Sequence, residues 1–162
     1  MYKSLAVEDI CRLLNIPGDY KVDGLLVCGT NPKVKEYPHF FEALDKLGIP
    51  YKEESFSSGF FSDVKIIKIG GRRIWFDVVY GTAYLGELIH VASMLGSKAN
   101  ILLGSCGALF ESLNTGDTII PRASYGNESS TRMYQRNNES YLYESSLALN
   151  AELKKHLPEN GY

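Results

Sequence analysis

The sequence has few of the features that mark several common classes of protein. Its three cysteines, Cys11, Cys28 and Cys106, are an odd number without a C-x-x-C spacing. This pattern argues against a disulfide framework or a structural zinc site and is typical of a reducing compartment. No apolar run approaches the ~20 residues that a membrane helix needs, and the amino-terminal residues carry no signal pattern. We therefore expect a soluble, cytoplasmic protein.

Concentrated positive charge is also missing. The formal net charge is −2, and lysines and arginines form no basic stripe. This excludes the electrostatic footprint of a nucleic-acid-binding protein, so we expect neither a nucleic-acid nor a membrane partner. The sequence contains no P-loop, H-E-x-x-H or G-x-S-x-G motif, and its three histidines have no metal-ligand spacing. We expect no metal and no cofactor.

The sequence does contain the composition and periodicity of one globular α/β domain over residues 1–162. Hydrophobic residues make up 44% of the chain, enough for a sizeable core. The predicted helices cover residues 4–14, with Ser4 as N-cap, 40–47, 82–95 and part of 143–157. The predicted strands cover residues 23–29, 64–69, 74–80, Ala99–Leu103 and 118–121. This order predicts a three-layer α/β domain with a mixed sheet. Residues 30–37, 55–62 and 124–140 are predicted loops, the second exposed and mobile.

The turn formed by Gly104, Ser105, Cys106 and Gly107 follows a predicted buried strand. An open α/β sheet binds its ligand at the carboxyl ends of its strands. Two glycines let the backbone approach a ligand, and successive N–H groups can form an anion nest. The alternative is a tight turn that serves only the architecture. Cys106 lacks a nearby base, so we expect a small buried hydrophobe rather than a nucleophile.

Two further segments are candidate binding residues. Gly29 directly follows the first strand, and the Lys33 cation lies four residues later, a pattern that suits phosphate or carboxylate. An ordinary turn has the same composition. Thr82 lies at the start of the long helix, where free N–H groups favour an anion, although it can equally be a simple N-cap.

Histidine and aromatic side chains leave further alternatives open. His39 lies beside the first loop and could reach a site, whereas we expect His90 and His156 to be structural. The aromatic loops could stack on a base, or cover a core or a subunit interface. Their members are Phe56, Phe60, Phe61, Tyr125, Tyr134, Tyr141 and Tyr143.

Three motifs occur in a characteristic order. The first is G-T-N-P-K at residues 29–33, and the second is the helix start at residues 82–87, which ends in Gly-Glu. The third and most specific, at residues 104–121, joins a G-[ST]-x-G turn to N-T-G-D-T-I-I-P. Together they resemble the nucleoside phosphorylase/nucleosidase superfamily, the purine nucleoside and uridine phosphorylase-like proteins. The resemblance covers nearly all of this chain but only the amino-terminal part of the family's domain.

The resemblance implies a three-layer α/β/α phosphorylase/hydrolase-like fold and a ribosyl transfer. Phosphate or water attacks C1′ of a nucleoside through an oxocarbenium-like transition state, and the base leaves. Carried over residue by residue, Gly29, Lys33 and Ser105 are phosphate-binding, and Thr82, Cys106 and Gly107 are nucleoside-binding. Phosphate is then a co-substrate, and a homo-oligomer, a dimer or a trimer of dimers, is expected. Residues 55–62 are a candidate subunit contact.

The chain also departs from the family pattern. Leu102 stands where phosphorylases usually carry an Arg two residues before the turn, and no Arg stands near Ser58, where a second is usual. Leucine cannot replace a bidentate guanidinium clamp. The family's catalytic acid and ribose-gripping carboxylate fall beyond Tyr162, so we expect no catalytic residue in this chain, a carboxyl-terminally truncated domain and impaired phosphorolysis. The alternatives are a non-catalytic binding or scaffold remnant and a nucleosidase-type hydrolase that uses water.

Overall fold

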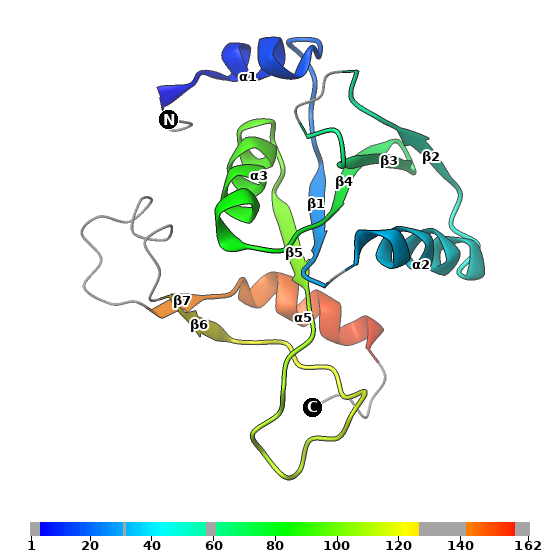
Figure 1. Ribbon diagram of the computed structural model, residues 1–162, viewed down its shortest axis with the longest axis vertical. Helices are drawn as coiled ribbons and strands as arrows, with labels where there is room; N and C mark the ends of the chain where they lie inside the picture. Colours follow the sequence, from blue (N-terminus) through cyan, green and yellow to red (C-terminus); the bar gives the residue numbers. More distant parts are fainter. Residues whose placement is uncertain (1–3, 31, 58–60, 127–141, 158–162) are drawn as a thin grey trace. The chain divides into compact units, whose positions relative to one another are not determined.

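The computed structural model describes residues 4–30, 32–57, 61–126 and 142–157, and they form an α/β protein (Figure 1). Contacts between residues group the chain into two compact units, Met1–Ser105 and Cys106–Tyr162. The helices of the first unit are α1 (Val7–Leu14), α2 (Lys33–Lys46) and α3 (Thr82–Met94). Its strands are β1 (Gly24–Cys28), β2 (Tyr51–Glu54), β3 (Lys65–Ile69), β4 (Arg72–Val78) and β5 (Ala99–Leu103). The second unit contains β6 (Ala123–Tyr125), β7 (Leu142–Glu144) and α5 (Leu147–His156).

The first unit is built on a mixed five-stranded sheet with the order β2-β3-β4-β1-β5. Strands β4, β1 and β5 are parallel, and β3 is antiparallel to both β2 and β4. Strands β3 and β4, which form a hairpin, agree with the strands predicted at residues 64–69 and 74–80. The two central residues of the hairpin, Gly70 and Gly71, have φ values of 55° and 79°. A two-residue hairpin turn favours this backbone conformation, which glycine adopts at little cost.

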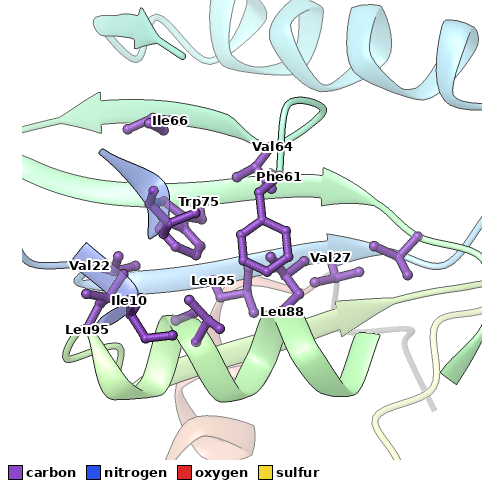
Figure 2. Packing of buried hydrophobic residues seen from close by; sticks show 14 of the residues in the cluster. Ile10, Val22, Leu25, Val27, Phe61, Val64, Ile66, Trp75, Leu88 and Leu95 are labelled. Carbon is purple, nitrogen blue, oxygen red and sulfur yellow. The ribbon is translucent and has the colours of Figure 1, made fainter. Parts of the chain in front are cut away.

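Helices cover both faces of this sheet. Successive side chains of a strand point to opposite faces, so each strand contributes side chains to both layers. Leu25 and Val27 of β1 pack with residues of α1 and α3, whereas Leu26 and Cys28 pack with residues of α2. This double coverage explains why β1 is a continuous apolar run in the sequence. Figure 2 shows the larger cluster, to which β4 contributes the fully buried Trp75 and α3 the fully buried Leu88.

The start of α2 corrects the predicted loop at residues 30–37, because the helix begins at Lys33 and includes Pro38. Proline inside a helix removes a hydrogen bond and is a signal for irregular structure. Here, aromatic packing opposes that cost. The rings of Phe40 and Phe76 are stacked with centroids 4.1 Å apart, and the ring of Tyr37 meets Phe76 edge-on at 5.7 Å.

Three other local predictions are wrong. Helix α1 begins at Val7 with Ala6 as its N-cap, not Ser4, and the Asp9 carboxylate accepts a hydrogen bond from the Ala6 N–H. Strand β2 falls in a segment without a strand prediction. Its charged side chains form ion pairs with β3, including Lys65–Glu53 at 2.8 Å and Lys68–Glu54 at 2.8 Å.

The third wrong prediction lies in the second unit, where residues 118–121 form no strand. Strand β6 begins later, at Ala123, and pairs antiparallel with β7. Strand β6 includes residues 124 and 125, so the predicted loop at residues 124–140 begins too early. Most of that loop lies outside the described residues. A turn precedes residues 118–121, and in it the Asp117 carboxylate accepts a 2.6 Å hydrogen bond from the Asn114 N–H.

Candidate functional site

The carboxyl ends of the three parallel strands lie level with one another. Cys28, the last residue of β1, pairs in register with Val78 of β4 and with Leu103 of β5. The backbone N–H of Gly29 then donates to the Leu103 carbonyl at 2.6 Å. Open parallel sheets bind ligands at this edge. The segments that follow these strands begin at Gly29, Val79 and Gly104, so candidate residues from three segments share one sheet edge.

The structure gives each predicted phosphate-binding residue a distinct setting. Gly29 lies in close contact with β5, since a Cβ atom added to it would lie 3.3 Å from the Leu103 carbonyl oxygen and 3.5 Å from Leu102 Cδ1. Lys33 is the first residue of α2 and is partly exposed. Ser105 is exposed at the end of the first unit, two residues beyond β5.

The predicted nucleoside-binding residues are all exposed. Thr82 is the first residue of α3, and its N-cap is Gly81, so the alternative of a simple N-cap role for Thr82 is wrong. Cys106 and Gly107 begin the second unit. The exposure of Cys106 also corrects its prediction as a small buried hydrophobe.

Leu102 and Leu103 correct the prediction that β5 is a buried strand. Their exposed fractions are 57% and 52%, because β5 is an edge strand of the five-stranded sheet. Leu102 nevertheless lies beside Gly29, the first residue of the predicted phosphate loop. The position at which the resembled family carries an arginine is therefore next to that loop.

The Lys33 ammonium group is engaged by two carboxylates. Its Nζ lies 2.7 Å from Asp63 Oδ2 and 3.5 Å from Asp77 Oδ1. Asp77 is completely buried on β4, whereas the Asp63 side chain is 59% exposed. One positive charge against two negative charges gives this group a net charge of −1 when all three are ionised.

The buried Asp77 carboxylate joins both helical layers to the sheet. Its Oδ1 accepts hydrogen bonds from the Tyr37 hydroxyl of α2 at 2.6 Å and from the Val78 N–H at 2.7 Å. Its Oδ2 accepts one from the Tyr84 hydroxyl of α3 at 3.1 Å. A buried charge is costly unless donors surround it, and these donors satisfy that requirement.

This environment raises the pKa of both tyrosines, Tyr37 and Tyr84. Burial raises the pKa of Tyr37, and its hydrogen bond to the Asp77 carboxylate raises that pKa further. Burial likewise raises the pKa of Tyr84, with the negative charges of Asp77, Asp63 and Glu87 acting in the same direction. Both hydroxyls therefore remain protonated donors at neutral pH, and neither is a candidate general base.

Sequence reasoning did not find this cluster, which consists of Lys33, Tyr37, Asp63, Asp77 and Tyr84. The one local signal was Asp77 itself, a single carboxylate in the apolar run from Ile74 to Val79. Charged residues are almost never fully buried unless they are paired. A lone acidic residue in a predicted buried strand thus indicated partners elsewhere in the chain.

The remaining candidates are spread over other elements. His39 is exposed on α2, His90 lies on α3, and His156 lies on α5 with Nε2 3.7 Å from Glu152. In the described part of the chain, no group of three or more histidine, cysteine or acidic side chains is placed to hold a metal ion.

The aromatic loops separate into core and surface positions. The Phe56 ring meets Trp75 edge-on at 5.2 Å, and the buried Phe61 contacts the same indole at 6.2 Å. The core-covering interpretation is therefore confirmed for these two, and the prediction of a wholly exposed loop at residues 55–62 is wrong. Tyr125 and Tyr143 belong to β6 and β7. Ser58, Phe60, Tyr134 and Tyr141 lie outside the described residues.

Comparison with known proteins identifies no relative. No protein-family model matches the chain, and no curated protein or solved structure matches it significantly. Among the described residues, no helix is both long and apolar enough to cross a membrane.

Proposed function

We propose that this protein is a nucleoside phosphorylase-like protein that binds nucleosides at the carboxyl edge of β4, β1 and β5. The observation that carries the proposal is the register of these strands, in which Cys28 pairs with both Val78 and Leu103. It brings Gly29 of the first motif to the same edge as the end of β5, where the third motif begins at Gly104. The fold is then the amino-terminal part of the phosphorylase/hydrolase-like arrangement. The setting is cytoplasmic, and the assembly is a homo-oligomer.

The proposed chemistry is cleavage of the N-glycosidic bond of a purine or pyrimidine nucleoside, with phosphorolysis impaired. Catalysis of this kind depends on stabilising developing charge and on positioning the reactants. Leu102 supplies no charge beside Gly29, where a phosphate oxygen would need a donor. We therefore expect this chain to bind nucleosides more readily than it turns them over with phosphate.

A second candidate function, hydrolysis of the same bond by water, is favoured by the contacts of Lys33. Its ammonium group already pairs with Asp63 and Asp77, and these carboxylates repel an incoming dianion. A neutral water molecule experiences no such repulsion.

Titration and turnover measurements separate these functions. Inosine, adenosine and uridine are each added to the protein, and binding is measured by calorimetry. Release of the base is then followed by chromatography with and without phosphate. The proposal predicts saturable binding of at least one nucleoside and at most slow phosphate-dependent release. Release at the same rate without phosphate supports the hydrolase, and absence of binding for all three nucleosides contradicts the proposal.

A further inference from the structure

Lys33 is the cation of the proposed phosphate loop, and its ion pairs determine what it can bind. Asp63 Oδ2, at 2.7 Å, lies within strong charge-assisted hydrogen-bond distance of the ammonium group. Asp77 Oδ1 lies 3.5 Å away on the buried side. A phosphate oxygen that approached Lys33 would have to displace Asp63 or share the ammonium group with both carboxylates.

The negative charges around this ammonium group further oppose the binding of phosphate to Lys33. Asp77 is completely buried, so water screens its charge less than it screens an exposed carboxylate. Glu87 of α3 adds a third negative charge close enough to act on Tyr84. Lys33 is the only cation that the described residues place within ion-pair distance of Asp63 or Asp77. Its single charge does not neutralise the acidic group.

We propose that Asp63 and Asp77 are specificity-determining residues that exclude phosphate from Lys33, so that the ligand bound beside Lys33 is uncharged. The proposal rests on the proposed function for the identity of the ligand, an uncharged nucleoside with water as its co-reactant. Its electrostatic part stands on the geometry of Lys33, Asp63 and Asp77 alone. Asp63 is exposed, so its charge can be removed without disturbing the core. The buried Asp77 also supports packing, so its substitution would affect folding as well.

The test measures binding of inorganic phosphate alone to wild type and to Asp63→Asn. Calorimetric titrations are run at constant ionic strength and at about pH 8, where a phosphate group carries nearly two negative charges. The substitution keeps the shape of the Asp63 side chain and removes its charge. We expect phosphate to bind Asp63→Asn at least about fivefold more tightly, the effect of removing one unit charge at a few ångströms in water.

Two further variants test whether the gain in phosphate affinity depends on Lys33. In the double variant Asp63→Asn/Lys33→Gln, the added phosphate affinity is expected to disappear because its receptor is gone. Asp45→Asn is the matched control, with the same chemical change at an exposed position in the last turn of α2. It is expected to bind phosphate as weakly as wild type.

Several results would overturn the proposal. Wild type that binds phosphate as tightly as Asp63→Asn shows that the carboxylates exclude nothing. A gain that survives Lys33→Gln, or that appears equally in Asp45→Asn, reflects overall charge rather than this site. A parallel titration with nucleosides keeps the two proposals apart. If wild type binds none of the three nucleosides, the proposed function is contradicted. The phosphate titrations by themselves decide the role of Asp63.

Discussion

The hydroxyl of Tyr37 on α2 donates a 2.6 Å hydrogen bond to the carboxylate of Asp77 on β4. The same carboxylate accepts from Tyr84 on α3, which covers the other face of the sheet. One buried charge thus links both helical layers through the strand between them. Its position near the carboxyl end of β4 ties the stability of the fold to the arrangement of the candidate site.

Replacing Asp77 by alanine is expected to destabilise the protein by about 3 kcal/mol, because it leaves Tyr37 and Tyr84 without their acceptor and removes a buried partner of Lys33. Urea unfolding monitored by circular dichroism measures the change. Asp45→Ala, at an exposed position, is the control and should shift the free energy of unfolding by less than about 0.5 kcal/mol.

A double-mutant cycle with Tyr37→Phe separates the hydrogen bond from other effects of the Asp77 substitution. The two changes should be non-additive, with a coupling energy of about 1 kcal/mol or more. Strict additivity, or a loss below about 1 kcal/mol for Asp77→Ala, would contradict the structural role given to this carboxylate.

Alkaline pH is expected to unfold the protein through Tyr37 and Tyr84. Both have a pKa raised by burial and then by Asp77, so their folded-state pKa lies above the unfolded value of about 10. The stability is fully present below about pH 10. It falls as pH rises, because the unfolded state then releases protons that the folded state retains.

Each tyrosine that resists ionisation contributes a slope of up to about 1.4 kcal/mol per pH unit in this range. The double variant Tyr37→Phe/Tyr84→Phe should therefore lose stability less steeply than wild type above about pH 10. Equilibrium unfolding at a series of pH values checks this, with the appearance of phenolate absorbance as a second readout. Equal slopes for the two proteins would be inconsistent with the raised pKa values.

Two glycines at the candidate edge should behave differently when they are replaced by alanine. A Cβ at Gly29 would press against the Leu103 carbonyl oxygen at 3.3 Å, so Gly29→Ala is expected to cost about 1 kcal/mol. A Cβ at Gly104 meets no atom within 4 Å, and Gly104→Ala should change the free energy of unfolding by less than about 0.5 kcal/mol.

The Gly104 variant also tests whether its turn binds a ligand. Because its fold is expected to be intact, weaker nucleoside binding in calorimetry would reflect crowding of the turn itself. Unchanged binding in Gly104→Ala would support the purely architectural interpretation of this turn.

Trp75 is the only tryptophan of the chain and provides an internal probe of the core. It is completely buried, and its Nε1–H donates to the Tyr20 hydroxyl at 3.2 Å. Tyr20→Phe is expected to reduce stability by about 1 kcal/mol, because the indole donor loses its acceptor. The exposed Tyr80 supplies the matched control, Tyr80→Phe. Tryptophan fluorescence during urea unfolding measures both variants, and equal midpoints would contradict the role of this hydrogen bond.

The sequence was sufficient for the elements whose signals are local. Strands β1, β3 and β4 and helix α3 all lie within or close to the predicted ranges and follow from short patterns. Such patterns reflect side-chain periodicity and backbone freedom, which depend on neighbouring residues.

Where packing competes with local signals, the sequence predictions were wrong. Residues 30–37 are a predicted loop, yet α2 begins at Lys33 and continues through Pro38, where Tyr37 and Phe40 pack against Phe76. Residues 118–121 are apolar enough for a strand but form none. A strand requires a partner with a matching register, and no local pattern specifies that partner.

For the candidate site, the sequence by itself predicted binding turns after two strands, with Gly29 and Lys33 among the candidate residues. Only the tertiary structure decided what Lys33 contacts. Asp77 lies 44 residues further along the chain, and the two meet because parallel pairing of β1 with β4 brings the start of α2 close to the end of β4. The net charge around a side chain depends on which groups lie near it in space. The order of residues therefore predicted the Lys33 cation, and only the fold showed that it pairs with Asp63 and Asp77.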